Sequence, residues 1–219
     1  VMNAAGLQRD VETLLHEGGH AFHYLWAYES QPVVFLHHAP LEFCEVASMS
    51  MELLGMDHFN VFYNDQDAAA RAKERLLSDV VHTLSWIAVI DGFQHWIYTH
   101  PDHTREQRTA AWREILSRFQ GDSVDYTGFE DVRDSLWQRQ LHLFHVPFYY
   151  IEYGIAQLGA LQLWQNYRKD PKQALEQYRQ ALSLGNSRPL PELFAAAGIR
   201  FDFTAETIAP LMQAVEAEV

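Results

Sequence analysis

Two histidines and a glutamate near the start of the chain have the types and the spacing of a metal site. The run His16-Glu17-Gly18-Gly19-His20 has the form His-Glu-x-x-His. Successive residues of an α-helix turn by about 100°, so His16 and His20 project about 40° apart, one turn above the other. Two imidazoles so placed can bind one zinc ion, and Glu17 beside them can take a proton from an attacking water. The spacing therefore predicts a hydrolytic metal centre.

A third ligand is expected on the segment that follows, because a catalytic zinc takes three protein ligands and keeps one position for water. Glu42, Glu45 and Glu52 share one face of a helix predicted over residues 41–55. This segment is too apolar for an easily exposed helix, and a buried carboxylate needs a cation or hydrogen-bond donors. Glu45 has the most apolar neighbours and is the preferred ligand, with Glu42 as the alternative. Glu52 is either a partner of a zinc-binding histidine or a plain surface acid.

A second group of chemically able side chains lies between residues 142 and 153, where two histidines and three tyrosines occur. Imidazole and phenol groups are donors that can stabilise an oxyanion. Tyr150 and Tyr153 share a face of a predicted helix, and His142 and His145 precede them. Aromatic residues at helical spacing are more often part of a core, so both interpretations stay open.

The elements that must position these residues are predicted to be helices throughout. Pro147 can begin the helix that carries the tyrosines, and Pro101 ends a long apolar helix. No segment alternates convincingly as a strand, so the expected fold class is all-α. The expected helices cover residues 7–28, 41–55, 65–100, 105–119, 129–141, 147–167, 171–184, 192–197 and a last segment from 204.

Gly18 and Gly19 stand out inside the first predicted helix, because each costs about 1 kcal/mol relative to alanine. Their position between His16 and His20 indicates that another helix or a substrate backbone approaches closely there. Plain tolerance of glycine in a buried helix explains them equally well.

Composition excludes several classes of protein. With 219 residues and 48% hydrophobic side chains, the chain can bury a substantial core, and one domain over residues 1–219 is expected. The net charge of −13 argues against binding to nucleic acid or to an anionic membrane. The longest apolar run, residues 84–90, is too short to cross a bilayer, and no signal peptide is visible. Cys44 is the single cysteine, which fits a reducing compartment, and a cytoplasmic location is expected.

The run from Met2-Asn3 through Gly6 and Asp10 to His23 resembles the active-site helix of M3-family metallopeptidases, with the oligoendopeptidase F and Pz-peptidase branch as the nearest match. The family's third zinc ligand is a glutamate 28 residues after the glutamate of the motif, which here is Glu45. The resemblance thus implies a zincin-like catalytic domain in which the His-Glu-x-x-His helix packs against the Glu45 helix. It also implies a zinc endopeptidase of short peptides, with one Zn²⁺ per chain and Glu17 as general base.

The resemblance extends over nearly the whole chain. Tyr150 and Tyr153 match the family's Tyr-x-x-Tyr, and His142 matches its substrate-contacting histidine, with His145 as the alternative. Residues 190–199 are similar to the family's C-terminal end. Gly18 stands where Phe or Ala is common in the family, a change that the fold is expected to tolerate.

Members of the family are much longer than this chain, and a large N-terminal helical part closes over their cleft. The chain begins on Val1 and reaches the motif within its first residues. We therefore expect a fragment that corresponds to the C-terminal catalytic portion and lacks an N-terminal domain of the same protein. Whether the fragment is active alone stays open at this point.

Two other interpretations fit parts of the sequence. Glu17-x-x-His20 also has the Glu-x-x-His form of a di-iron carboxylate bundle, although Asp79-x-x-His82 is a poor second copy. Residues 170–182 look like half of a tetratricopeptide repeat, which favours a helical binding module without catalysis. That stretch occurs once, and such repeats need about three copies to be stable.

Overall fold

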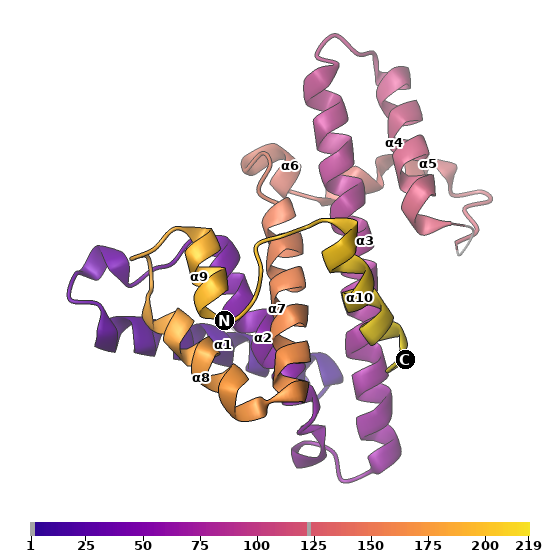
Figure 1. Ribbon diagram of the computed structural model, residues 1–219. Coiled ribbons are helices and arrows are strands. Elements are labelled where there is room, and N and C mark those ends of the chain that lie inside the picture. The colour runs from indigo at the N-terminus through magenta and orange to yellow at the C-terminus, as the bar shows by residue number, and fades with distance from the viewer. Residues whose placement is uncertain (1–2, 122–123) are drawn as a thin grey trace. The chain divides into compact units, whose positions relative to one another are not determined.

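The computed structural model describes residues 3–121 and 124–219 (Figure 1). Residues 1–2, which include Met2 of the family-like run, and residues 122–123, in the loop expected over 120–128, lie outside the described part. Every regular element of the described residues is a helix, which confirms the all-α prediction. The elements are α1 (Gln8–Ser30), η1 (Val34–Leu36), α2 (Leu41–Met56), η2 (Phe59–Val61), α3 (Gln66–Thr99), α4 (Arg105–Gln120), α5 (Glu130–Ser135), η3 (Leu136–Arg139), α6 (His142–His145), α7 (Ile151–Lys169), α8 (Pro171–Ser183), α9 (Leu190–Ala196) and α10 (Ala205–Glu216).

The single helix predicted over residues 129–141 is wrong in one respect. The α-helix ends at Ser135 and a 3₁₀-helix, η3, follows it. The indole N–H of Trp112 donates to the carbonyl of Arg133 at 2.7 Å, a bond that competes with regular helical pairing at this point. Trp137 is only 9% exposed, because it packs into the core beside Phe93. Tertiary packing thus overrides the local helical pattern.

A helix beginning at Pro147 is the second error. Residues 142–145 form the short helix α6, and α7 begins only at Ile151. Phe148 lies between them with φ of 61°, a left-handed conformation that a bulky side chain rarely adopts. Its ring contacts those of His95 and Tyr98, with centroid distances of 5.0 and 4.9 Å. These contacts stabilise a turn in which a continuous helix was expected.

The chain divides into two compact units, and the division falls inside α3 and near the start of α7. The first unit comprises Val1–Asp79 and Ile155–Val219, and the second comprises Val80–Gly154. The first unit contains the His-Glu-x-x-His helix and Glu45, whereas the second contains the His142 to Tyr153 cluster. Each unit has its own core and is described by itself.

The core of the first unit is built by α2, α7, α8 and α9. Fully buried side chains include Phe43 and Val46 on α2, Tyr178 on α8 and Phe194 on α9. Helix α1 packs against α2 and α8, and α9 lies beside α8 and α2 (Figure 1). The predicted packing of the motif helix against the Glu45 helix is therefore present.

The core of the second unit is aromatic. Phe93 on α3 and Trp112 on α4 are fully buried, with ring centroids 5.1 Å apart. Val89, Ile90 and Leu116 fill the space around them. This core supports the segment over residues 136–150, whose Leu143 and Tyr150 pack on its edge.

Within the described residues, α3 is long and apolar enough to cross a membrane by length and composition. It contains an 18-residue window with a mean hydropathy of 1.3, of which 39% is buried. Core helices of soluble proteins pass the same test, so this property assigns no membrane location.

Candidate metal centre

Helix α1 presents His16, Glu17 and His20 from its third and fourth turns. The helix starts firmly, because the carboxylate of Asp10 accepts the backbone N–H groups of Ala5 and Leu7, both at 2.8 Å. A carboxylate in the first turn also lies favourably in the field of the helix dipole. These bonds hold the pKa of Asp10 below its ordinary value.

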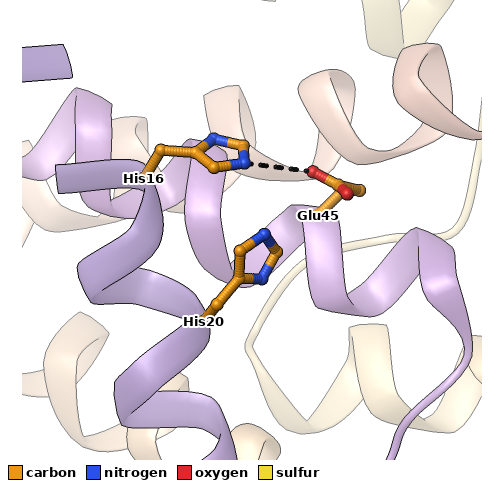
Figure 2. Close-up of side chains that lie close together, drawn as sticks. All are labelled: His16, His20 and Glu45. Carbon is orange, nitrogen blue, oxygen red and sulfur yellow. Dashed lines mark ion pairs between the residues drawn. The ribbon is translucent and has the colours of Figure 1, made fainter. Parts of the chain in front are cut away.

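The two motif histidines and Glu45 converge at the packed face of α1 and α2 (Figure 2). One ligand atom from each of His16, His20 and Glu45 lies within 4.8 Å of the others, and all three side chains are half-buried. The imidazole rings meet edge to face, with centroids 4.8 Å apart. The Nε2 atom of His16 lies 3.5 Å from the Oε2 atom of Glu45. These donors could hold one metal ion.

Gly19 permits this close approach of the two helices. A Cβ atom at Gly19 would lie 2.6 Å from the carbonyl oxygen of Ala47 and 2.6 Å from the Cα atom of Ser48. A Cβ atom at Gly18 would meet nothing within 4 Å. The two glycines thus differ: close helix packing explains Gly19, and the expected tolerance of change applies to Gly18.

Ser48 holds the Glu45 carboxylate from one turn further along α2. Its fully buried hydroxyl donates to the Oε2 atom of Glu45 at 3.2 Å and also lies 3.1 Å from the Glu45 carbonyl oxygen. The hydroxyl of Tyr178, on α8, donates to the carbonyl of Ala47 at 2.6 Å. The sequence analysis missed Ser48, although its position three residues after a ligand was a usable signal.

Glu52 is the partner of a motif histidine. Its Oε1 atom lies 2.6 Å from the Nδ1 atom of His16, which decides between the two interpretations that the sequence left open. A carboxylate at Nδ1 leaves Nε2 as the coordinating nitrogen, a common arrangement around metal-bound histidines. Glu42, the alternative ligand, is not in the group of candidate donors found among the described residues.

The two histidines have pKa values shifted in opposite directions. Burial would lower the pKa of His16, but the hydrogen bond and charge of Glu52 and the charges of Glu45 and Glu17 raise it above its ordinary value. Burial lowers the pKa of His20, and the nearby His16 adds to the effect. The charge of Glu17 acts on both imidazoles, so its exposed carboxylate is close to the candidate metal centre.

The aromatic cluster of the second unit forms around His142. The His142 ring lies 5.0 Å from Tyr150 and 5.8 Å from Tyr153 between centroids, and it stacks on Tyr149 at 5.7 Å. His145 is exposed on the same short helix. Of the two candidate histidines, His142 is thus the one whose ring contacts both predicted tyrosines.

The helical fold, with two candidate histidine ligands on a His-Glu-x-x-His helix and one candidate glutamate ligand on the helix packed against it, indicates the class: a metallopeptidase. The model of peptidase family M3 matches residues 1–212, and the chain belongs to this family.

Known proteins agree with this assignment. An oligoendopeptidase F homolog from Borreliella burgdorferi is 24% identical over 190 residues, which are 84% of this chain and 31% of that protein. The solved structure of PZ peptidase A with inhibitor 2 is 31% identical, with a TM-score of 0.87 over 98% of this chain. A structure assigned to oligoendopeptidase F is 32% identical, with a TM-score of 0.84 over 98% of this chain. This chain covers 38% of each of those two structures.

Proposed function

We propose that this chain is the catalytic portion of a zinc-dependent endopeptidase that hydrolyses short peptides. The observation that carries the proposal is the convergence of His16, His20 and Glu45, with ligand atoms within 4.8 Å of one another. Two imidazoles and one carboxylate, with a fourth position left for water, are a donor set that suits catalytic zinc. The carboxylate of Glu52 against His16 supports the same assignment.

Each side chain has a distinct task in this proposal. When bound, zinc supplies a Lewis acid that polarises the scissile carbonyl and makes water more acidic. Glu17 takes the proton of the attacking water and passes it to the leaving amine. Ser48 and Glu52 hold Glu45 and His16 in their orientations, so that the ligand geometry exists before the substrate arrives.

His142, Tyr150 and Tyr153 are proposed to donate hydrogen bonds to the oxyanion or to position the peptide. Their mutual ring contacts support a common task, and a lowered pKa of His142, caused by burial and by His145, favours a neutral ring. Neutral imidazole and phenol groups are suitable donors to a developing negative charge. The resemblance to the M3 family motif is what assigns these residues to the same reaction as the metal ligands.

The partners follow from this proposal. Oligopeptides are the substrates, and nucleic acid and membranes are not expected as partners because the net charge is −13. The B. burgdorferi relative is about three times as long as the matched region, so we infer that an N-terminal domain of the same protein completes the cleft. The cytoplasm remains the proposed location.

Substitution of Glu17, the proposed general base, tests the proposal. In the polypeptide that contains this chain, Glu17→Gln is expected to retain zinc and to lower the hydrolysis of a quenched-fluorescent peptide by about 10²-fold or more, because the proton acceptor is removed. Glu29→Gln, an exposed acid on the same helix, is the matched control and should keep wild-type activity. Full peptidase activity in Glu17→Gln with zinc bound would falsify the mechanism.

The structure favours neither of the two alternatives. A di-iron carboxylate site requires a second cluster of ligands, and the described residues contain a single group able to hold a metal. A binding module without catalysis does not explain why the motif histidines and Glu45 converge. Elemental analysis separates all three, because it distinguishes zinc, iron and no metal.

A further inference from the structure

His142 is held by an amide as well as by tyrosine rings. The side-chain Nε2 atom of Gln140 lies 2.7 Å from the Nδ1 atom of His142. On its other side, the Oε1 atom of Gln140 accepts the indole N–H of Trp86 at 3.1 Å. Trp86 packs edge to face on the buried Trp112, with centroids 5.9 Å apart, which anchors the start of this chain of bonds in the aromatic core.

Trp86 fixes the orientation of the Gln140 amide. An indole N–H can only donate, so the group that faces it must be the amide oxygen. The NH₂ group of Gln140 then faces His142, and because it too can only donate, the Nδ1 atom of His142 must accept. A neutral imidazole that accepts at Nδ1 carries its proton at Nε2. If the amide were reversed, the NH₂ group of Gln140 would face the indole N–H of Trp86. Two donors would then oppose each other, and the indole would lack an acceptor.

We propose that Trp86 and Gln140 are positioning residues that set His142 as a hydrogen-bond donor, neutral and in the Nε2–H form. The proposal rests on the proposed function, in which His142 donates a hydrogen bond to the substrate oxyanion or positions the peptide. A hydrogen-bond donor that is oriented before the substrate binds needs no reorganisation during the reaction. This is the condition for effective stabilisation of a developing charge.

The tautomer of His142 can be read directly by nitrogen-15 NMR of ring-labelled histidine in the 219-residue chain. Wild-type protein, at a pH above the pKa of His142, is expected to show the proton on Nε2. Gln140→Glu keeps the shape of the side chain but offers His142 a carboxylate, which accepts from Nδ1–H and favours the charged ring. The substitution should therefore move the proton to Nδ1 and raise the pKa of His142.

Gln138→Glu is the matched control, because it adds the same charge two residues away at an exposed position. It should leave His142 in the Nε2–H form. Trp86→Phe removes the donor that orients Gln140 and should give a mixture of tautomers. A wild-type proton on Nδ1, or a tautomer and pKa of His142 unchanged in Gln140→Glu, would overturn the proposal. The wild-type spectrum decides even if a variant does not fold.

Peptide hydrolysis distinguishes this inference from the proposed function. In the complete polypeptide, Gln140→Glu is expected to lower kcat by about 10²-fold, the effect of one lost oxyanion donor, with a smaller change in KM. A changed tautomer with unchanged kcat would overturn the catalytic part of the inference while leaving the peptidase assignment intact. Absence of hydrolysis in the wild-type polypeptide would instead contradict the proposed function, whatever the tautomer.

Discussion

The carboxylate of Glu52 and the Nδ1 atom of His16 lie 2.6 Å apart, so the fourth helical turn of α2 holds a ring of the His-Glu-x-x-His motif. The side chain of Glu52 is 20% exposed and that of His16 is 26% exposed, so water screens this pair only in part. The contact orients the imidazole and leaves Nε2 toward Glu45. The candidate metal centre is thus supported by a residue that does not itself belong to the group of candidate ligands.

Removal of this partner should weaken metal binding. Glu52→Ala is expected to lower the affinity for zinc about 10- to 100-fold, because the ring of His16 loses its orientation and basicity. Glu52→Gln, which can still accept from Nδ1–H, should lose less. Isothermal titration calorimetry measures the change. The control is Glu42→Ala, which also removes a carboxylate from α2 and should bind zinc like wild type. Equal affinity in Glu52→Ala and wild type would show that the contact is incidental.

The neighbouring glycines of the motif should respond in opposite ways to alanine. Gly18→Ala is expected to raise the free energy of unfolding by up to about 1 kcal/mol, because alanine favours the helix and its Cβ meets no atom within 4 Å. Gly19→Ala should lower it by about 1–3 kcal/mol, because its Cβ would press on the backbone of Ala47 and Ser48.

Urea denaturation of both variants measures the two changes, and each variant is the control for the other. Gly19→Ala should also weaken zinc binding, because it moves Glu45 away from the motif histidines. If Gly19→Ala were as stable as Gly18→Ala, the close approach of α1 and α2 would not limit this position.

Much of the fold and of the candidate metal centre could be predicted from the sequence. Helical periodicity placed α1 and α2 nearly at their observed bounds. The spacing of His16 and His20 is local. Glu45 was preferred over Glu42 because a carboxylate among apolar neighbours needs a cation, and the resemblance to the M3 family then implied Glu45. The helical bounds and the spacing of the two histidines depend on residues within a few turns of each other, which is the range over which sequence patterns are informative.

The remaining features depend on contacts between distant residues. The turn at Phe148 exists because its ring packs on His95 and Tyr98 of α3, far away in the sequence. The orientation of Gln140 likewise depends on Trp86, and no local pattern joins the two residues. The division into two units, through α3 and α7, also interrupts helices that read as continuous.

His23 should make the stability of the chain fall in mild acid. Burial, together with the charges of His20 and His38, lowers the pKa of His23 to about 4. The unfolded chain binds this proton near pH 6.5 and the folded chain only near pH 4, so the stabilisation is complete above pH 6.5 and is lost as pH falls toward 4. The full loss corresponds to about 3 kcal/mol.

Urea denaturation between pH 4 and pH 7 checks this window. His23→Leu should flatten the pH dependence relative to wild type, because leucine does not titrate. His82→Leu and His145→Leu, changes at two exposed histidines of the second unit, should each keep the wild-type slope. A wild-type slope in His23→Leu would assign the acid sensitivity to other groups.

The most direct test of the central claim is the metal content of the chain after dialysis against zinc, measured by elemental analysis for wild type, Glu45→Ala and Glu42→Ala. Because His16, His20 and Glu45 are the candidate ligands, wild type and Glu42→Ala should each hold about one zinc per chain, and Glu45→Ala should hold far less. Full zinc retention in Glu45→Ala, or two irons per wild-type chain, would contradict the account.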